Sequence, residues 1–364
     1  MFIIDDTFTS ARLREFAKTH SENCLDADIL FEGNDPKIEY LLSAISREYS
    51  PKIYTNSERA VNWIRANLPD SVLAQKLGFF KNKFAFRQLV KDSYPDFRCV
   101  EIDVQNIKPP LEFPFIVKPV EGFLSEGVTL VANEKNWNDL VSRIGKGITD
   151  YIAEELIEGE EFAVDAFFDS RGKPTILDIF RHPFPNAENT VDRLYYTSKK
   201  VIAEEMSIAI NLLEDILKYI ELKNFPLHLE YRKRDSTAIP IEVNPMRFAG
   251  WCTTEMVNCA YKINPYEYFF EDKSPDWARI LKEKKANEIY YFAIAENPSR
   301  LITSVFKQKE FLVNFENPIE TNFAQNGKVL PIFGVVFGKS ERQEEIEKIL
   351  GIDISAYIEK DSPF

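Results

Sequence analysis

A chain of 364 residues is longer than one hydrophobic core usually supports, so two or three structural units are expected. Apolar residues make up 45% of the chain and charged residues 28%, and no stretch approaches the roughly 18 apolar residues of a membrane helix. The net charge of −13 opposes binding to a phosphate backbone. Neither a membrane nor a nucleic acid is therefore an expected partner.

The N-terminal residues MFIIDDTFTS have no basic segment before their apolar run, so we interpret them as a first strand rather than a signal peptide and expect a cytoplasmic protein. The four cysteines include no CxxC pair and the three histidines stand apart, which argues against a zinc site or a disulfide framework. Residues 1–75 alternate short apolar runs with helical patterns, which is typical of βα units on a mostly parallel sheet. No GxGxxG follows the first strand, so the dinucleotide-binding fingerprint is absent.

A helical pattern over residues 76–93 leads to FPFIVKPV, a predicted strand with Lys118 near its end. The loop that follows, EGFLSEGV, contains Gly122, Ser125 and Gly127. Such small residues allow backbone N–H groups to approach phosphate oxygens beside a lysine. Taken alone, Lys118 is more simply interpreted as a lysine whose stem covers apolar surface at a strand end, and the loop is what favours a phosphate ligand.

Two more strands are predicted in residues 151–168 and 174–180, and apolar residues at helical spacing over 203–220 predict an amphipathic helix packed on them. Within the first of these stretches, strand-like residues that end in Glu154, Glu155, Leu156 and Ile157 could offer their backbone groups to the edge of an adenine. Glu161 could accept hydrogen bonds from ribose hydroxyls. A solvated acidic turn is the alternative interpretation.

The stretch PLHLEYRKRDSTAIPIEVNP, residues 226–245, carries Glu230 on one predicted strand and Glu242 and Asn244 on the next. Residues two apart on a strand face the same side, so Glu242 and Asn244 share a face that Glu230 can join. Two carboxylates and an amide oxygen suit Mg²⁺, which keeps waters and bridges to substrate phosphates. A carboxylate pair in this apolar setting is costly without a cation, so we predict a magnesium site. His228 would be an interior histidine or a group that orients a metal ligand.

Together, the order and spacing of these segments resemble the ATP-grasp superfamily over residues 76–270. The resemblance implies an α/β chain, α+β in its nucleotide-binding part, with an ATP-grasp fold. We expect a Rossmann-like domain at 1–75, a small subdomain with a phosphate lid at 76–150, a large subdomain at 151–275 and a small α/β appendage at 276–364.

The resemblance also implies how ATP would be bound. Lys83, within NKFAFRQLV, and Lys118 would contact the phosphates, although Asn82 stands where the superfamily often has Asp. The loop containing Gly122, Ser125 and Gly127 would cover the phosphates, and the adenine and ribose would be bound by Glu154, Glu155, Leu156, Ile157 and Glu161.

Metal and catalytic roles follow from the same resemblance. Mg²⁺ or Mn²⁺ would be bound by Glu230, Glu242 and Asn244. Arg247 resembles an arginine near the transferred phosphate but lies one residue later than usual. From its chemistry, Arg181 is our candidate to stabilise an acyl-phosphate, because a guanidinium suits phosphate and carboxylate, and pairing with local acids is the open alternative.

Enzymes of the ATP-grasp superfamily usually join a carboxylate to an amine. The carboxylate attacks the γ-phosphate of ATP, and the amine captures the acyl-phosphate to give an amide, ADP and phosphate. The resemblance therefore implies a ligase for small carboxylate and amine substrates, with amino acids or peptides suggested by analogy and a homodimer common among similar proteins. The alternatives are a non-catalytic or regulatory ATP-binding module, and an ATP-grasp enzyme with a different acceptor or reaction.

Overall fold

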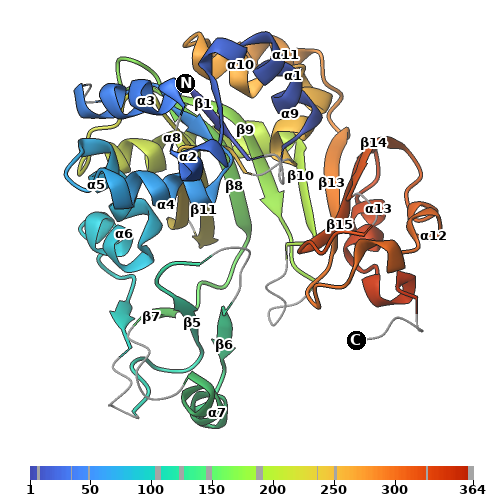
Figure 1. The fold of residues 1–364 in the computed structure, drawn as a ribbon. Coiled ribbons are helices and arrows are strands. Elements are labelled where there is room, and N and C mark those ends of the chain that lie inside the picture. The colour runs from blue at the N-terminus through green and yellow to red at the C-terminus, as the bar shows by residue number, and fades with distance from the viewer. Residues whose placement is uncertain are drawn as a thin grey trace.

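The computed structural model describes residues 1–5, 9–33, 35–47, 50–102, 108–122, 127–144, 150–185, 192–235, 237–249, 252–324 and 327–359. Within these residues the strands form three sheets, two of which bring together the candidate site residues (Figure 1).

The N-terminal unit is a parallel sheet covered by helices, as its alternating pattern predicts. Its strands lie in the order β2-β1-β3 and span β1 (Phe2–Ile4), β2 (Cys24–Asp26) and β3 (Tyr54–Thr55). The helical segments are α1 (Ala11–Thr19), η2 (Ser21–Asn23), α2 (Ile29–Glu32), α3 (Pro36–Arg47) and α4 (Glu58–Asn67). Helix α3 buries Ile38, Leu41 and Ile45, which recur at helical spacing on one side of the helix.

A smaller unit with its own apolar core projects below the main body (Figure 1). Two helices lead into it, α5 (Val72–Lys81) and α6 (Lys83–Val90). Its antiparallel sheet has the order β4-β7-β5-β6, formed by β4 (Cys99–Glu101), β5 (Phe115–Pro119), β6 (Thr129–Val131) and β7 (Tyr151–Glu155). Helix α7 (Glu134–Ile144) places Trp137 against Phe115, and the two rings form the centre of this core.

The largest sheet has eight strands in the order β12-β11-β8-β9-β10-β13-β15-β14. The strands are β8 (Glu161–Phe168), β9 (Pro174–His182), β10 (Leu194–Ser198), β11 (Phe225–Arg234), β12 (Thr237–Pro245), β13 (Ile289–Glu296), β14 (Pro318–Phe323) and β15 (Ile332–Ser340). The amphipathic helix α8 (Lys199–Leu217) packs against β9, as its apolar spacing predicts. Strands β13 to β15 continue the sheet beyond β10, so the expected C-terminal appendage shares one sheet with the large subdomain.

Helices near the top of Figure 1 connect the large sheet to the N-terminal unit. The remaining helical segments are α9 (Thr253–Tyr261), α10 (Pro265–Phe270), α11 (Trp277–Lys282), η3 (Thr303–Val305), α12 (Gln308–Leu312), α13 (Gln343–Leu350) and η4 (Ile354–Tyr357). Phe2 of β1 stacks on Phe270 of α10, with ring centroids 4.5 Å apart, and one continuous apolar core runs from the N-terminal sheet through the large sheet. The Tyr54 ring contacts the Phe248 ring and the N–H of Thr55 donates to the carbonyl oxygen of Met246 at 2.9 Å, so the N-terminal unit also lies against the segment that follows β12.

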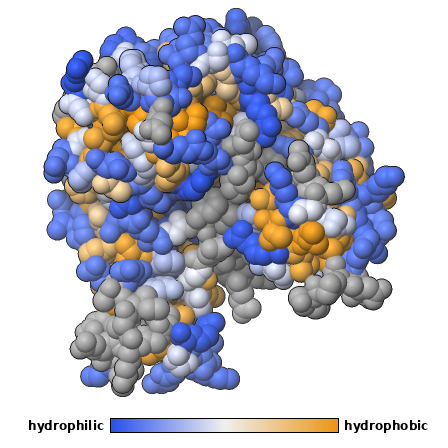
Figure 2. Space-filling view, in the orientation of Figure 1, coloured by the Kyte–Doolittle hydropathy of each residue, from blue (hydrophilic) through white to orange (hydrophobic). Residues whose placement is uncertain are grey.

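The face shown in Figure 2 is largely hydrophilic, with apolar residues gathered over the C-terminal part of the chain at the right and in the upper part of the view. Among the residues that the structure describes, none of the helices has the length and apolar character needed to cross a bilayer.

Candidate active site

Lys118 lies in a buried ion pair between two strands of the small sheet. Its Nζ is 2.6 Å from Oε2 of Glu154, and the register of β5 and β7 places the two residues diagonally across the ladder on one face. Arg87 of α6 donates from Nε to the other carboxylate oxygen of Glu154 at 2.6 Å. All three side chains are buried. The strand-end lysine is therefore held inside the protein rather than exposed at its surface.

The charges of these three groups depend on one another. Burial alone would raise the pKa of Glu154, but the positive charges of Arg87 and Lys118 outweigh it and lower that pKa to about 2. Burial lowers the pKa of Lys118, and the negative charge of Glu154 opposes that effect. Glu154 is therefore ionised at neutral pH and supports a positive charge on Lys118, which suits an anionic ligand.

The predicted magnesium ligands share one face of β11 and β12, which confirms the period-two argument. Glu230 lies directly opposite Glu242 in the ladder, and His228 lies opposite Asn244. The side chains of both glutamates are 23% exposed, whereas Asn244 is buried. Nζ of Lys83 lies 3.1 Å from Oε1 of Glu242, so α6 brings the first predicted phosphate lysine to the same face.

Three cationic groups compensate the negative charges of Glu230 and Glu242. Burial would raise the pKa of Glu242, but the charges of Lys83 and Lys118 lower it. His228 lies between two carboxylates, with Nδ1 2.8 Å from Oδ1 of Asp165 and Nε2 3.3 Å from Oε1 of Glu230. Burial would lower the pKa of His228, but these two hydrogen bonds raise it to about 9. A cationic His228 therefore reduces the repulsion between the two glutamates.

The donor set fits a magnesium ion that is also bound to phosphate. In the described part of the chain, no group of three His, Cys, Asp or Glu side chains is arranged to hold a metal ion by itself. Glu230, Glu242 and Asn244 provide two carboxylates and one amide oxygen. Mg²⁺ commonly takes one or two carboxylates and completes its coordination with water and substrate phosphates. Glu230, Glu242 and Asn244 therefore suit a magnesium ion that is also bound to phosphate, and not one that is bound by protein ligands alone.

Arg247 links the magnesium face to the N-terminal unit. Strand β12 ends at Pro245, and Met246 has a φ of 62°, so the chain turns sharply before Arg247. Nη2 of Arg247 donates to Oδ1 of Asn244 at 2.9 Å and lies 3.1 Å from Oε1 of Glu58, near the start of α4. Lys81 contacts the other oxygen of Glu58 at 2.6 Å. Arg247 lies one residue later than the arginine that it resembles in the superfamily, but it is still beside the predicted metal ligands.

The predicted adenine-binding segment joins the small sheet to the large one. Strand β7 ends at Glu155, and Leu156 and Ile157 lie in the irregular connection to β8. Gly159 in this connection has a φ of +152°, and a Cβ there would lie 1.8 Å from the carbonyl oxygen of Lys233. Only glycine fits at this position, a constraint that the sequence alone did not indicate.

Glu161 has two internal partners that the sequence did not predict. Its Oε1 lies 2.8 Å from Nδ1 of His182, and its Oε2 accepts from Nε of Arg232 at 2.6 Å. Burial would raise the pKa of Glu161, but the contacts with His182 and Arg232 lower it. Binding of ribose hydroxyls by Glu161 stays a prediction and would use the remaining lone pairs of its carboxylate.

Arg181 does not lie on the face that carries the predicted metal ligands, and its catalytic role stays a prediction. Glu161 pairs with His182 across β8 and β9, and consecutive residues of a strand point to opposite faces. Arg181 therefore points to the other face of the sheet, where it contacts Glu160 and lies 6.0 Å from the centre of the Tyr196 ring. This is the pairing with local acids that remained open from the sequence.

The predicted phosphate loop is described only at its two ends. Ser125 lies outside the described residues, whereas Gly122 and Gly127 lie inside them. Gly127 has a φ of +80°, a left-handed conformation that favours glycine. The contribution of this loop to phosphate binding stays a prediction.

Comparisons with known proteins bear on the family and the fold of this chain. Residues 111–255 match the family described as the ATP-grasp domain. The L-amino acid ligase from Bacillus licheniformis has a similar fold, with a TM-score of 0.67 and 17% identity over 98% of this chain and 97% of that chain. The carboxyaminoimidazole ribonucleotide synthase from Aspergillus clavatus, complexed with ATP, has a TM-score of 0.65 and 12% identity over 98% of this chain and 99% of that chain.

At the level of sequence, the D-alanine–D-alanine ligase of Petrotoga mobilis is 30% identical over 83 residues. The alignment spans 23% of this chain and 28% of that ligase. Residues 111–255 match the ATP-grasp domain, and the chain has the ATP-grasp fold, as its sequence predicts. It is similar to ATP-grasp carboxylate–amine ligases.

Proposed function

We propose that this protein is an ATP-dependent ligase that joins a small carboxylate to an amine through an acyl-phosphate. The observation that carries the proposal is the contact between Lys83 and Glu242, whose charged atoms lie 3.1 Å apart. It brings a predicted phosphate lysine to a face that also carries Glu230 and Asn244. A site that combines lysine with two carboxylates and an amide suits a phosphate chain bound to Mg²⁺.

In this proposal the chain acts mainly by positioning and by electrostatic stabilisation. Lys83 and Lys118 would contact the phosphates of ATP, and Arg247 would stabilise the transferred phosphoryl group beside Asn244. Mg²⁺ bound by Glu230, Glu242 and Asn244 would neutralise charge on the phosphate oxygens. No covalent protein nucleophile is required, because phosphoryl transfer to a carboxylate depends on orientation and charge stabilisation.

Amino acids are the first substrates to test for both the carboxylate and the amine. Two of the similar proteins, the L-amino acid ligase and the D-alanine–D-alanine ligase, are named for amino-acid substrates. The adenine of ATP would lie along the connection formed by Glu154, Glu155, Leu156 and Ile157, between the two sheets.

The test is ATP turnover with Mg²⁺ in the presence of amino acids and small carboxylic acids, supplied singly and in pairs. The proposal predicts ADP and phosphate release that requires two substrates, together with a condensed product of matching mass. A Glu242→Gln variant prepared in the same way should show a weaker signal, and an unchanged signal would indicate a contaminating enzyme. Release of AMP would contradict the acyl-phosphate route, and ATP binding without stimulated turnover would favour the non-catalytic binding module.

A further inference from the structure

Arg87 joins two sheets at the edge of the candidate site. It lies on α6 one helical turn after Lys83 and is only 4% exposed. Its Nε donates to Oε1 of Glu154 on β7, in the small sheet, at 2.6 Å. Its Nη2 donates to the carbonyl oxygen of Ile241 on β12, in the large sheet, at 2.8 Å, and its Nη1 donates to that of Pro240. A single guanidinium thus connects both halves of the nucleotide-binding fold.

The contact on β12 falls on a bulge. Strands β11 and β12 pair Tyr231 with Pro240 and Glu230 with Glu242, so Ile241 is an extra residue in the ladder. In the described sheet β12 is the edge strand, and donors for its outer carbonyl groups must come from outside the sheet. The two terminal nitrogens of the Arg87 guanidinium donate to the carbonyl groups of Pro240 and Ile241, directly before Glu242. Arg87 therefore binds the backbone of the bulge that directly precedes Glu242.

The contact on β7 acts on the phosphate lysine. Oε1 of Glu154 accepts from Nε of Arg87 at 2.6 Å, and Oε2 contacts Nζ of Lys118 at 2.6 Å and Nη2 of Arg87 at 3.4 Å. Because Arg87 also neutralises the buried negative charge of Glu154, this charge does not depend on Lys118 alone. Without Arg87, Lys118 would be the main compensation for a buried carboxylate, and a phosphate would have to compete with a stronger pair.

We propose that Arg87 is a positioning residue that fixes Lys118 and Glu242 relative to one another, through Glu154 on one side and the β12 bulge on the other. The inference rests on the proposed function, since it assumes that both residues act on Mg-ATP. It predicts that the loss of Arg87 weakens the binding of the nucleotide and raises the Mg²⁺ concentration needed for binding.

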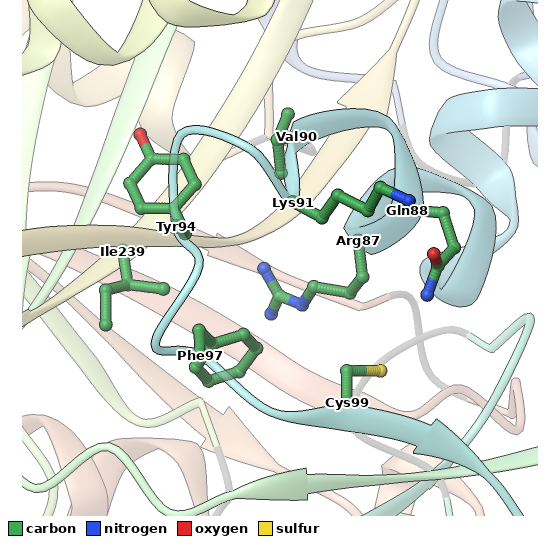
Figure 3. A pocket seen from close by; sticks show the side chains of 8 residues that line it. All are labelled: Arg87, Gln88, Val90, Lys91, Tyr94, Phe97, Cys99 and Ile239. Atoms are coloured by element: carbon green, nitrogen blue, oxygen red, sulfur yellow. The ribbon is translucent and has the colours of Figure 1, made fainter.

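A cavity beside Arg87 allows a direct test of the guanidinium itself. The cavity has a volume of about 40 Å³ and is lined by α6, the segment that follows it and β12 (Figure 3). Figure 3 shows the guanidinium pointing between Phe97 and Ile239, and its carbon lies 4.7 Å from the centre of the Phe97 ring. Truncation of Arg87 to alanine would extend this cavity enough to admit a free guanidinium ion.

The test measures binding of a non-hydrolysable ATP analogue to the full chain as a function of Mg²⁺ concentration. For Arg87→Ala we expect the dissociation constant to rise by about tenfold or more, which corresponds to about 1.4 kcal/mol. Addition of millimolar guanidinium chloride should restore much of this affinity, whereas sodium chloride at the same ionic strength should not. A second variant, Arg87→Lys, keeps the charge but cannot reach both strands, so it should weaken binding in the same direction.

The matched control is Arg234→Ala. Arg234 of β11 contacts Glu155, the neighbour of Glu154 on β7, and therefore also links the two sheets. Consecutive residues of β7 point to opposite faces, so this pair lies away from Lys118. Removal of the Arg234 side chain should change the affinity for the analogue by less than about twofold, and guanidinium should not alter it.

Arg87 variants that bind like the wild type, or lost affinity that guanidinium does not restore, would overturn the inference. A wild-type chain that fails to bind the analogue would overturn the proposed function itself.

Discussion

Replacement of Glu154 by glutamine tests whether its negative charge holds two cations in the protein interior. Glu154 is 4% exposed, and its two oxygens lie 2.6 Å from Nε of Arg87 and 2.6 Å from Nζ of Lys118. Glutamine keeps the shape of the side chain and removes the charge. The variant therefore leaves Arg87 and Lys118 buried without their shared carboxylate, which is costly in a poorly solvated site.

The size of the effect follows from the pKa of Glu154, which falls from 4.5 to about 2 in the folded protein. At about 1.4 kcal/mol per pKa unit, this difference corresponds to about 3 kcal/mol of stability at neutral pH. Removal of one partner of a buried ion pair typically costs about 3 to 5 kcal/mol, which agrees. With an unfolding entropy of about 2.1 cal/mol/K per residue, the thermal midpoint of this chain should fall by about 4 °C.

Differential scanning calorimetry of the wild type and Glu154→Gln measures this shift. A carboxyl group with a lowered pKa in the folded state stabilises the protein above its unfolded pKa, and this contribution is lost as the pH falls through the folded pKa. The difference between the two proteins should be complete at pH 7 and shrink as the pH falls from about 4.5 towards 2.

The control is Glu155→Gln, on the next residue. The side chain of Glu155 is 16% exposed and contacts Arg234 and Arg98, which are themselves partly exposed. This substitution should lower the midpoint by about 1 °C or less. Equal shifts for the two variants, or a Glu154→Gln shift that does not depend on acidic pH, would refute the reasoning.

Three further substitutions, one of them with a matched control, test separate parts of the account. Gly159→Ala should lower the free energy of unfolding by about 2 kcal/mol or more, since its Cβ would lie 1.8 Å from the carbonyl oxygen of Lys233. Gly78→Ala, on α5 with no atom within 4 Å of the added Cβ, should not destabilise the protein in the same urea denaturation assay. Lys118→Ala should raise the KM for ATP and lower kcat together, and unchanged steady-state kinetics would remove it from the site. Glu242→Gln should lower kcat and raise the Mg²⁺ concentration at half-maximal rate, and an unchanged Mg²⁺ titration would contradict its role as a ligand.

Local sequence patterns were sufficient to predict the features that depend on strand periodicity. The alternating apolar runs of residues 1–75 predicted parallel strands, and the period of two predicted that Glu242 and Asn244 share a face with Glu230. The order of lysines, acidic residues and the final Glu–Asn pair was sufficient to indicate the ATP-grasp fold.

Features that depend on long-range register could not be predicted in this way. Whether Arg181 or His182 faces the site depends on how β9 pairs with β8, and a shift of one residue exchanges the two faces. Arg87 contacts Glu154 and Ile241, which lie 67 and 154 residues later in the chain. The one available signal was its position four residues after Lys83, on the same side of a helix. The pairing of β13 with β10 likewise has no local signature.

The most direct test of the proposed acyl-phosphate follows oxygen from the carboxylate substrate. With a carboxylate substrate labelled with ¹⁸O and a paired amine, attack on the γ-phosphate transfers one labelled oxygen to the inorganic phosphate that is released when the amide forms. The account predicts singly labelled phosphate in the amount of the amide product. Unlabelled phosphate together with amide formation, or label recovered in AMP, would contradict it.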